Sequence, residues 1–569
     1  MKRCPQCGRE YDNSMMFCLD DGAELLYGPA SMDGPVTAVL PLGVPPSGGL
    51  PSESATQPQI HTTTPNSQPR IKTGQTTNKA AKPLMAAAAL IVILAGSYFG
   101  YRYLSPAGPK QIESIAVMPF VNESGNADIE YLSDGMTETL INSLSQVPNL
   151  SVKARSLVFR YKGKEIEPKK IGGELNVQAI VTGRIVDRGG QLTLNLELID
   201  AQTENTLWGN KYERKASDLV SLQSEIARDV SSRLKARLSG AEIAKVEKNS
   251  TTDSEAFQLY LKGKFQWNKR TEEALKQAAT FYSQAIERDP NYALAYSGLA
   301  ETYVLYSSYD VASADDSMPQ AKAAAMRALE IDESLAEAHT ALGFYFANYE
   351  WDRDRSEQEY RRAIGLKPNY STAHHWFGAD IGNLKRFDES LAEMKLAEEL
   401  DPLSSIIGSN IGDMLVLARR YDEALAQYKR VIARNPTFPY VYVAMSRAYG
   451  AKGMYDEAIA AARRYQELGN SPLGDGTQGL WLAKAGKRDE AVKLLGDLKQ
   501  AAAKEYIQNY DFALIYVGLG DREEALNYLE RHMTARAETA NVYAVAPELD
   551  DLRFEPRFKA MLKKMNLPE

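Results

Sequence analysis

The stretch from residue 368 to residue 402 reads PNYSTAHHWFGADIGNLKRFDESLAEMKLAEELDP. It begins and ends on a proline, and a further proline, Pro436, stands 34 positions beyond Pro402. Proline ends a helix because it lacks an N–H group and clashes with the preceding turn. A proline every 34 residues therefore predicts a unit of two antiparallel helices that repeats along the chain.

Within each unit, large and small residues recur at fixed offsets from the proline. They are Phe377, Gly378, Ser390 and Ala397 before Pro402, and Ile411, Gly412, Ala424 and Tyr428 before Pro436. Small residues let the two helices of a hairpin cross closely, and large residues fill the holes between neighbouring hairpins. The pattern predicts a mainly α-helical solenoid.

This period and these offsets resemble those of tetratricopeptide repeats. We expect about eight repeats over residues 254–538, and we expect residues 539–569 to close the last hairpin and cap the exposed end. The resemblance implies a superhelix whose groove, lined by the first helix of each hairpin, binds protein or peptide partners.

A smaller α/β domain is predicted over residues 112–240. Apolar strands near 115–120, 150–154, 179–187, 192–200 and 206–212 are interleaved with helical patterns at 134–144, 168–175 and 216–238. Arg188, Gly189 and Gly190 form the turn of a hairpin between two of the strands. Asp134 is expected to cap the first helix, since its carboxylate can accept from free backbone N–H groups. The order of these elements resembles the TolB-like amino-terminal domain of bacterial proteins, an accessory module without known chemistry.

The three cysteines all lie within the first 18 residues, so they cannot build a disulfide framework. Cys4 and Cys7 stand three positions apart beside Gly8, the spacing of a zinc knuckle. Cys18 follows, and Asp21, or less favourably Asp20, takes the place of a fourth ligand. Residues 1–27 resemble a short zinc ribbon of bacterial regulatory proteins, which implies a structural zinc ion on Cys4, Cys7, Cys18 and Asp21. A domain of this size needs its metal to fold.

Residues 28–83 hold 10 of the 26 prolines and are predicted to be a disordered linker. Residues 84–101 carry no charge over a length that matches a bilayer core, which predicts one transmembrane helix over residues 84–104. Four Lys or Arg residues shortly before this segment outnumber the two that follow closely. We therefore expect a single-pass protein of the bacterial inner membrane with a cytoplasmic N-terminus and an extracytoplasmic α/β domain and repeat array.

The composition and the missing motifs exclude several function classes. Lys and Arg total 66 against 74 Asp and Glu, which argues against a protein that mainly grips nucleic-acid phosphates. Nucleotide-binding loops, metalloprotease motifs, nucleophile elbows and kinase signatures are missing from the sequence. His374 and His375 are adjacent, so they diverge on a helix and are interpreted as packing residues. We expect no catalytic residues, no small-molecule substrate and no cofactor besides zinc.

Two hypotheses about function remain. The first is a non-enzymatic membrane-anchored scaffold whose repeats bind a protein or peptide. The second is a signalling or regulatory subunit that couples an extracytoplasmic sensor array to a cytoplasmic zinc ribbon. It rests on the resemblance, because bacterial relatives join the same modules to a kinase, a nucleotide cyclase or a DNA-binding domain. A repeat-bearing enzyme would need a further catalytic domain, and no unassigned segment has that length.

Overall fold

The structure is a computed structural model that describes residues 2–3, 10–11, 112–126, 129–145, 147, 149–165, 167–234, 251–309, 311–469, 476–504 and 507–569. The chain divides into two compact units, Met1–Leu104 and Ser105–Glu569. The first unit contains strands β1 (Lys2–Arg3) and β2 (Glu10–Tyr11), which pair antiparallel.

Several predictions fall on residues that the structure does not describe. The four zinc ligands, the linker over 28–83 and the membrane segment over 84–104 all lie outside the described ranges. Among the helices that are described, none combines the length and the hydrophobicity needed to cross a bilayer. These predictions stay predictions.

The predicted α/β region is confirmed, and it contains one mixed sheet in the order β5-β3-β6-β7-β8, with β4 also paired to β6. The strands are β3 (Ser114–Val117), β4 (Val121–Asn122), β5 (Ser151–Val152), β6 (Ala179–Arg188), β7 (Gln191–Asp200) and β8 (Thr206–Lys215). β3 pairs parallel with β5 and β6, whereas β6–β7 and β7–β8 are antiparallel. Gly189 and Gly190 form the β6–β7 turn with φ of 64° and 86°, a backbone region that glycine adopts without strain.

Helices cover both faces of this sheet at β3 and β6, where the consecutive residues 115–117 and 179–181 are buried, and one face at β7. On β7, Leu192, Leu194, Leu196 and Leu198 are buried, while Asn195 and Glu197 on the other face are exposed. The covering helices are α2 (Glu130–Leu144), α4 (Pro168–Leu175) and α5 (Leu219–Leu234), and a short helix, α3 (Arg155–Phe159), follows β5. The predicted helix from 216 begins as a 3₁₀ turn, η2 (Ala216–Asp218), before α5.

The predicted helix cap at Asp134 is wrong. Helix α2 begins four residues earlier, at Glu130, so Asp134 lies within the helix. Its carboxylate accepts from Lys162 Nζ at 2.6 Å, and burial raises its pKa although Lys162 acts in the opposite direction. A Cβ on the next residue, Gly135, would lie 2.8 Å from a methyl carbon of Leu261. The Asp-Gly pair therefore allows close packing between α2 and the repeat array.

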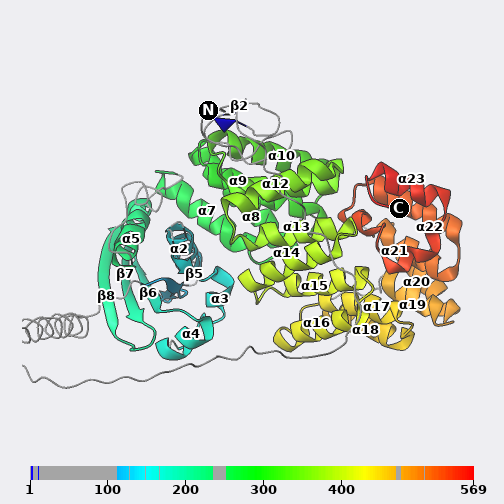
Figure 1. The fold of residues 1–569 in the computed structure, drawn as a ribbon, viewed down its shortest axis with the longest axis horizontal. Helices are drawn as coiled ribbons and strands as arrows, with labels where there is room; N and C mark the ends of the chain where they lie inside the picture. Colours follow the sequence, from blue (N-terminus) through cyan, green and yellow to red (C-terminus); the bar gives the residue numbers. More distant parts are fainter. Residues whose placement is uncertain are drawn as a thin grey trace, which may run out of the picture. The chain divides into compact units, whose positions relative to one another are not determined.

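The predicted helical solenoid is confirmed over the described part of residues 254–534, where the helices pair into hairpins along the chain (Figure 1). The hairpins are α7 (Ser254–Trp267) with α8 (Glu272–Arg288), α9 (Ala293–Tyr306) with α10 (Ala314–Ile331), α11 (Ala336–Tyr345) with α12 (Arg353–Leu366), α13 (Ser371–Asn383) with α14 (Phe387–Leu400), α15 (Ser405–Leu417) with α16 (Tyr421–Arg434), α17 (Tyr440–Ala451) with α18 (Tyr455–Leu468), α19 (Gly476–Lys484) with α20 (Arg488–Ala501), and α21 (Asn509–Leu519) with α22 (Arg522–Thr534). The shorter elements are η3 (Ser307–Tyr309) after α9 and the π-helical turn η4 (Phe346–Glu350) after α11.

Within a hairpin, a buried tyrosine of the second helix packs over a glycine of the first. A Cβ on Gly412 would lie 2.2 Å from Cε1 of Tyr428, and a Cβ on Gly343 would lie 2.9 Å from the ring of Tyr360. Both tyrosine hydroxyls donate to a buried aspartate, Tyr428 to Asp413 at 2.7 Å and Tyr360 to Asp380 at 2.8 Å. The small position predicted at Gly412 is thus required by the facing ring.

Residues 538–569, called the tail below, do more than cap the last hairpin. The tail comprises η5 (Glu538–Val542), η6 (Pro547–Leu552) and α23 (Pro556–Lys564). Helix α23 packs on α22, as expected of a cap. In addition, η5 contacts α13 and η4, and η6 contacts α17 and α21. The tail therefore returns to hairpins formed almost 200 residues earlier.

Candidate functional site

A cavity of about 1520 Å³, called the chamber below, lies within the Ser105–Glu569 unit. Its lining comes largely from the first helices of the hairpins, namely α7, α9, α11, α13, α15 and α17. Helices α2 and α3 of the α/β region and the start of the tail, at residues 537–539, complete the lining. The groove predicted from the repeats is therefore enclosed by segments from both ends of the unit.

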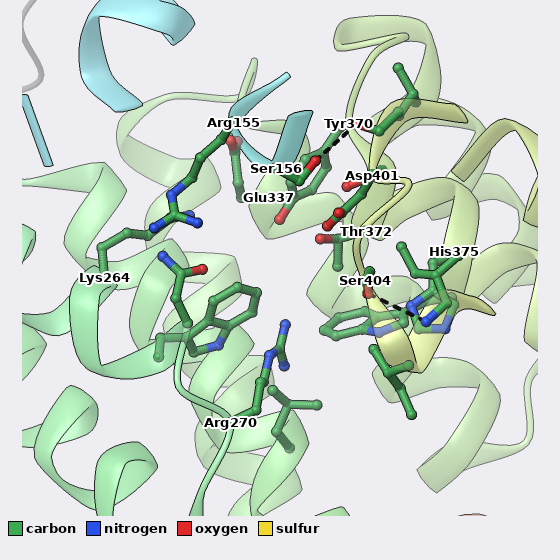
Figure 2. A pocket seen from close by; sticks show the side chains of 18 of the residues that line it. Arg155, Ser156, Lys264, Arg270, Glu337, Tyr370, Thr372, His375, Asp401 and Ser404 are labelled. Carbon is green, nitrogen blue, oxygen red and sulfur yellow. Dashed lines mark hydrogen bonds between the residues drawn. The ribbon is translucent and has the colours of Figure 1, made fainter. Parts of the chain in front are cut away.

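Helix α3 forms one wall by contacting two distant hairpins. Arg155 Nε lies 3.1 Å from Glu138 of α2, and Lys264 of α7 lies 3.7 Å from the same carboxylate. One residue further, Ser156 Oγ donates to the carbonyl oxygen of Leu400, at the end of α14, at 3.3 Å. Figure 2 shows Arg155 and Lys264 on one side of the chamber and Asp401, Ser404 and His375 on the other.

The start of the tail forms another wall. The Glu538 carboxylate accepts from the Ser308 hydroxyl, and burial raises the pKa of Glu538. Just before it, Arg536 donates to the carbonyl oxygen of Tyr349 and lies over the rings of Tyr349 and Trp351 at 4.6 and 4.9 Å. These contacts attach residues 536–538 to the second and third hairpins.

Most charged groups around the chamber are paired within the chain. Glu337 accepts from Lys367 Nζ at 2.8 Å. Burial acts to raise the pKa of Glu337, but Lys367 acts in the opposite direction, and the pKa is lowered overall. Glu301 accepts from the hydroxyl of Tyr370, and burial raises its pKa. Asp380, bonded to Tyr360, has its pKa raised to about 7 by burial.

The exception is Arg270, at the end of the α7–α8 turn. Its guanidinium lies 3.6 Å from the centre of the Trp267 ring, a cation–π contact. Burial lowers the pKa of Arg270. Nearby, Trp376 and Phe344 have their ring centres 5.0 Å apart. In Figure 2 the guanidinium of Arg270 points into the space between the two sides of the chamber.

The two adjacent histidines diverge as predicted. His374 is a packing residue, held by Glu393 at 2.6 Å and by the carbonyl oxygen of Pro368 at 2.9 Å. His375 instead faces the chamber, where its Nε2 lies 3.0 Å from Nδ2 of Asn410. Burial, aided by the charge of Arg270, lowers the pKa of His375 to about 3, so its ring is neutral at physiological pH.

Beyond the chamber, the tail fills the part of the groove formed by the later hairpins. Arg353 donates to Asn541 Oδ1 at 2.7 Å and to the carbonyl oxygen of Met565 at 3.0 Å. Arg447 Nε donates to Glu548 Oε1 at 2.7 Å, and the Glu548 side chain is only 1% exposed. Burial acts to lower the pKa of Arg447, but nearby negative groups, first among them Glu548, act in the opposite direction, and the pKa is raised overall.

The metal site predicted from the sequence and the chamber found in the structure lie in different parts of the chain. Cys4, Cys7, Cys18 and Asp21 lie outside the described ranges, and no cluster of three or more metal-ligating side chains occurs within them. The groove was predicted, but its enclosure and its lone arginine were missed. Arg270 follows Asn268 and Lys269 in sequence and has the pattern of a solvated basic turn, so no local signal marks it.

Two families match parts of the chain. Residues 110–229 match the family described as HilA/YgeH-like transcriptional regulator, second domain, and residues 415–471 match a tetratricopeptide-repeat family. The chain therefore carries tetratricopeptide repeats, as predicted. The resemblance of the α/β region to the TolB-like domain stays a prediction.

Two curated relatives cover larger parts of the chain. "Putative adenylate cyclase 3" of Rhizobium meliloti (strain 1021) is 30% identical over 259 residues, which cover 45% of this chain and 42% of the relative. "Transcriptional regulator HilA" of Salmonella typhimurium is 20% identical over 319 residues, 54% of this chain and 56% of the relative. The chain thus spans about half the length of these relatives.

The solved structure of pilF from Pseudomonas aeruginosa is 23% identical, with a TM-score of 0.31. The match covers 40% of this chain and 96% of that chain.

Proposed function

We propose that the protein is a non-enzymatic, membrane-anchored scaffold that holds a protein or peptide partner in the chamber. The chamber itself, about 1520 Å³ and lined by the first helices of six hairpins, carries this proposal. Small-molecule sites are usually about 300–1,000 Å³, so this volume favours a peptide of several residues. His375 supports a non-enzymatic role, because its ring is bonded to an amide, at Asn410, and not to a hydroxyl group that it could activate.

A photo-crosslinking amino acid at Thr372, which lines the chamber, tests the scaffold directly. The matched position is Asp422 on α16, whose side chain is 86% exposed. In cells that produce the full chain, the scaffold predicts a discrete protein adduct from position 372 and none from position 422. Equal labelling at the two positions, or no adduct at either, would contradict it.

Membrane anchoring and zinc binding belong to the same proposal. The apolar run over 84–104 supports a single inner-membrane span with a cytoplasmic N-terminus. A reporter active only outside the cytoplasm, fused after residue 240, should then be active; an inactive reporter on an expressed fusion would reverse the orientation.

For zinc, β1 and β2 pair on either side of the segment that contains Cys4 and Cys7, which supports a knuckle there. A peptide of residues 1–28 should bind one zinc ion through Cys4, Cys7, Cys18 and Asp21. A reduced, carefully purified peptide without zinc would exclude this site.

A signalling role is the second candidate. It is favoured by the match of residues 110–229 to a domain of transcriptional regulators and by the relative named as an adenylate cyclase. All three cysteines lie in the predicted ribbon, so their reactivity toward a thiol reagent reports on that segment alone. Partner binding to the repeats should leave this reactivity unchanged in a plain scaffold and change it in a signalling subunit.

A further inference from the structure

Arg270 is held toward the chamber by its own turn. Its φ is 54°, a left-handed backbone conformation that directs the chain from α7 into α8. The guanidinium stacks on Trp267 at 3.6 Å, which leaves the edge that carries its N–H groups available to a planar anion. Trp376 and His375, the latter with a neutral ring, lie in the same chamber.

Among the described residues, no carboxylate lies within ion-pair distance of Arg270. Two other cations that line the chamber are paired, Arg155 with Glu138 and Lys367 with Glu337, whereas Lys269 is exposed. A cation that is removed from water without an anionic partner is unfavourable. The lowered pKa of Arg270 has this cause.

The chain itself shows how the groove accommodates a similar arginine elsewhere. Arg447, on the first helix of the sixth hairpin, pairs with Glu548 of the tail. The neighbours of that glutamate, Ala546, Leu549 and Leu552, are buried. The occupant of this part of the groove is therefore a short segment in which an acidic residue is flanked by apolar ones.

We propose that the chamber takes a segment of the same chemistry from a partner protein, with an acidic side chain on the guanidinium of Arg270 and apolar neighbours against Trp376 and Phe344. The inference rests on the proposed function and specifies its ligand. The segment is short, because α3 and residues 537–539 border the chamber and the tail fills the groove beyond it.

The test uses the full-length chain and a fluorescent hexapeptide with the sequence Pro-Glu-Leu-Asp-Asp-Leu of residues 547–552, labelled at its blocked N-terminus and amidated at its C-terminus. Blocking both ends leaves only side-chain carboxylates. A matched peptide carries Gln and Asn in place of Glu and Asp. Fluorescence anisotropy should show binding of the acidic peptide and at least tenfold weaker binding of the amide peptide.

Arg270→Gln should weaken binding of the acidic peptide at least tenfold. The control variant Lys395→Gln, which changes an exposed cation of α14 outside the chamber lining, should alter it less than twofold. Asp310 lies next to Tyr309 but outside the described ranges, so Asp310→Asn is included and should change the affinity less than threefold. The unfolding transition of each variant shows whether it is folded.

Three results would overturn the proposal: no binding of the acidic peptide to the wild-type chain, binding that survives Arg270→Gln or the amide substitutions, or tenfold tighter binding by Asp310→Asn. The last would show that the chain supplies its own carboxylate to Arg270. Crosslinking from position 372 distinguishes failure of the anion subsite at Arg270 from failure of the proposed scaffold function. An adduct that persists in folded Arg270→Gln, together with peptide binding that survives the substitution, would remove the anion subsite and keep the scaffold.

Discussion

Arg270, in the α7–α8 turn, and Arg447, within α17, lie in two halves of one groove, and only Arg447 has an ion pair among the described residues. Arg447 lies in the half filled by the tail, where Glu548 lies 2.6 Å from its guanidinium. Arg270 lies in the chamber, where its guanidinium stacks on the face of Trp267 and has no ion pair among the described residues. The half of the groove that is filled by the tail thus supplies a carboxylate to its arginine. The other half presents an arginine to the chamber without an ion pair among the described residues.

The electrostatics of the two halves differ accordingly. Burial acts on both guanidinium groups in the same direction, since it disfavours a charge that has left water. At Arg447 the charge of Glu548, together with Tyr510, Asp413 and Tyr440, more than offsets burial and the pKa rises, whereas at Arg270 burial prevails and the pKa falls. A buried arginine is therefore a structural element in one half and a candidate recognition element in the other.

The largest expected effect comes from removing the tail's carboxylate. Glu548→Gln leaves Arg447 buried without its charged partner, and breaking such a pair costs about 3–5 kcal/mol. We expect about 3 kcal/mol, at the lower end, because the buried Asp413 still offers negative charge near Arg447. Hydrogen exchange should accelerate over residues 538–552. The control Asp550→Asn, at an ion pair with Arg419 that is largely exposed, should change little.

Acid should loosen the tail. His532 Nδ1 lies 2.7 Å from the Tyr543 hydroxyl, and burial lowers the pKa of His532 from 6.5 to about 4. Between these pH values the unfolded chain binds a proton that the folded chain does not, so stability falls as the pH falls. The loss reaches about 3 kcal/mol at most.

Asp380 has the opposite effect on overall stability, because burial raises its pKa to about 7 and the folded chain therefore binds its proton first. For this reason the measurement is local: hydrogen exchange in the tail at pH 7 and pH 4.5, in the wild type and in His532→Gln. Tail protection that falls equally in both proteins would exclude His532 as the cause.

A smaller, local loss is expected from Gly412→Leu. The new side chain displaces the Tyr428 ring, which lies 2.2 Å from the position of a Cβ, and over-packing of this kind costs about 1–3 kcal/mol. Because each repeat contacts mainly its neighbours, protection should fall over roughly residues 371–470 and persist in the α/β region. Gly365→Leu is the control, since nothing lies within 4 Å of a Cβ there. Uniform loss along the whole chain would contradict an independent solenoid.

The elements that sequence predicted well are those set by local rules. The 34-residue spacing of the prolines gave the hairpins around Gly378 and Gly412, and Gly189-Gly190 gave the β6–β7 turn because both residues need positive φ. Asp134 was misassigned because an Asp-Gly pair at the edge of an apolar pattern also fits a helix start. Only the approach of Leu261 from α7 explains Gly135.

The candidate site was harder to predict because its parts are distant in sequence. Ser156 meets Leu400 across 244 positions, and Arg447 meets Glu548 across 101. No periodicity records such contacts, since each residue alone has the pattern of an ordinary surface group. The groove could be predicted from the repeat; which half is filled, and by what, depends on tertiary contacts of the tail and of α3.

The most direct test compares Arg270→Gln with Arg447→Gln in urea-induced unfolding of the full-length chain. If one arginine is a structural partner and the other awaits a ligand, Arg447→Gln should lower the free energy of unfolding by about 3 kcal/mol. Arg270→Gln should leave the free energy of unfolding unchanged or raise it slightly, because an unpaired, partly buried charge is removed. A loss from Arg270→Gln as large as that from Arg447→Gln would contradict the account.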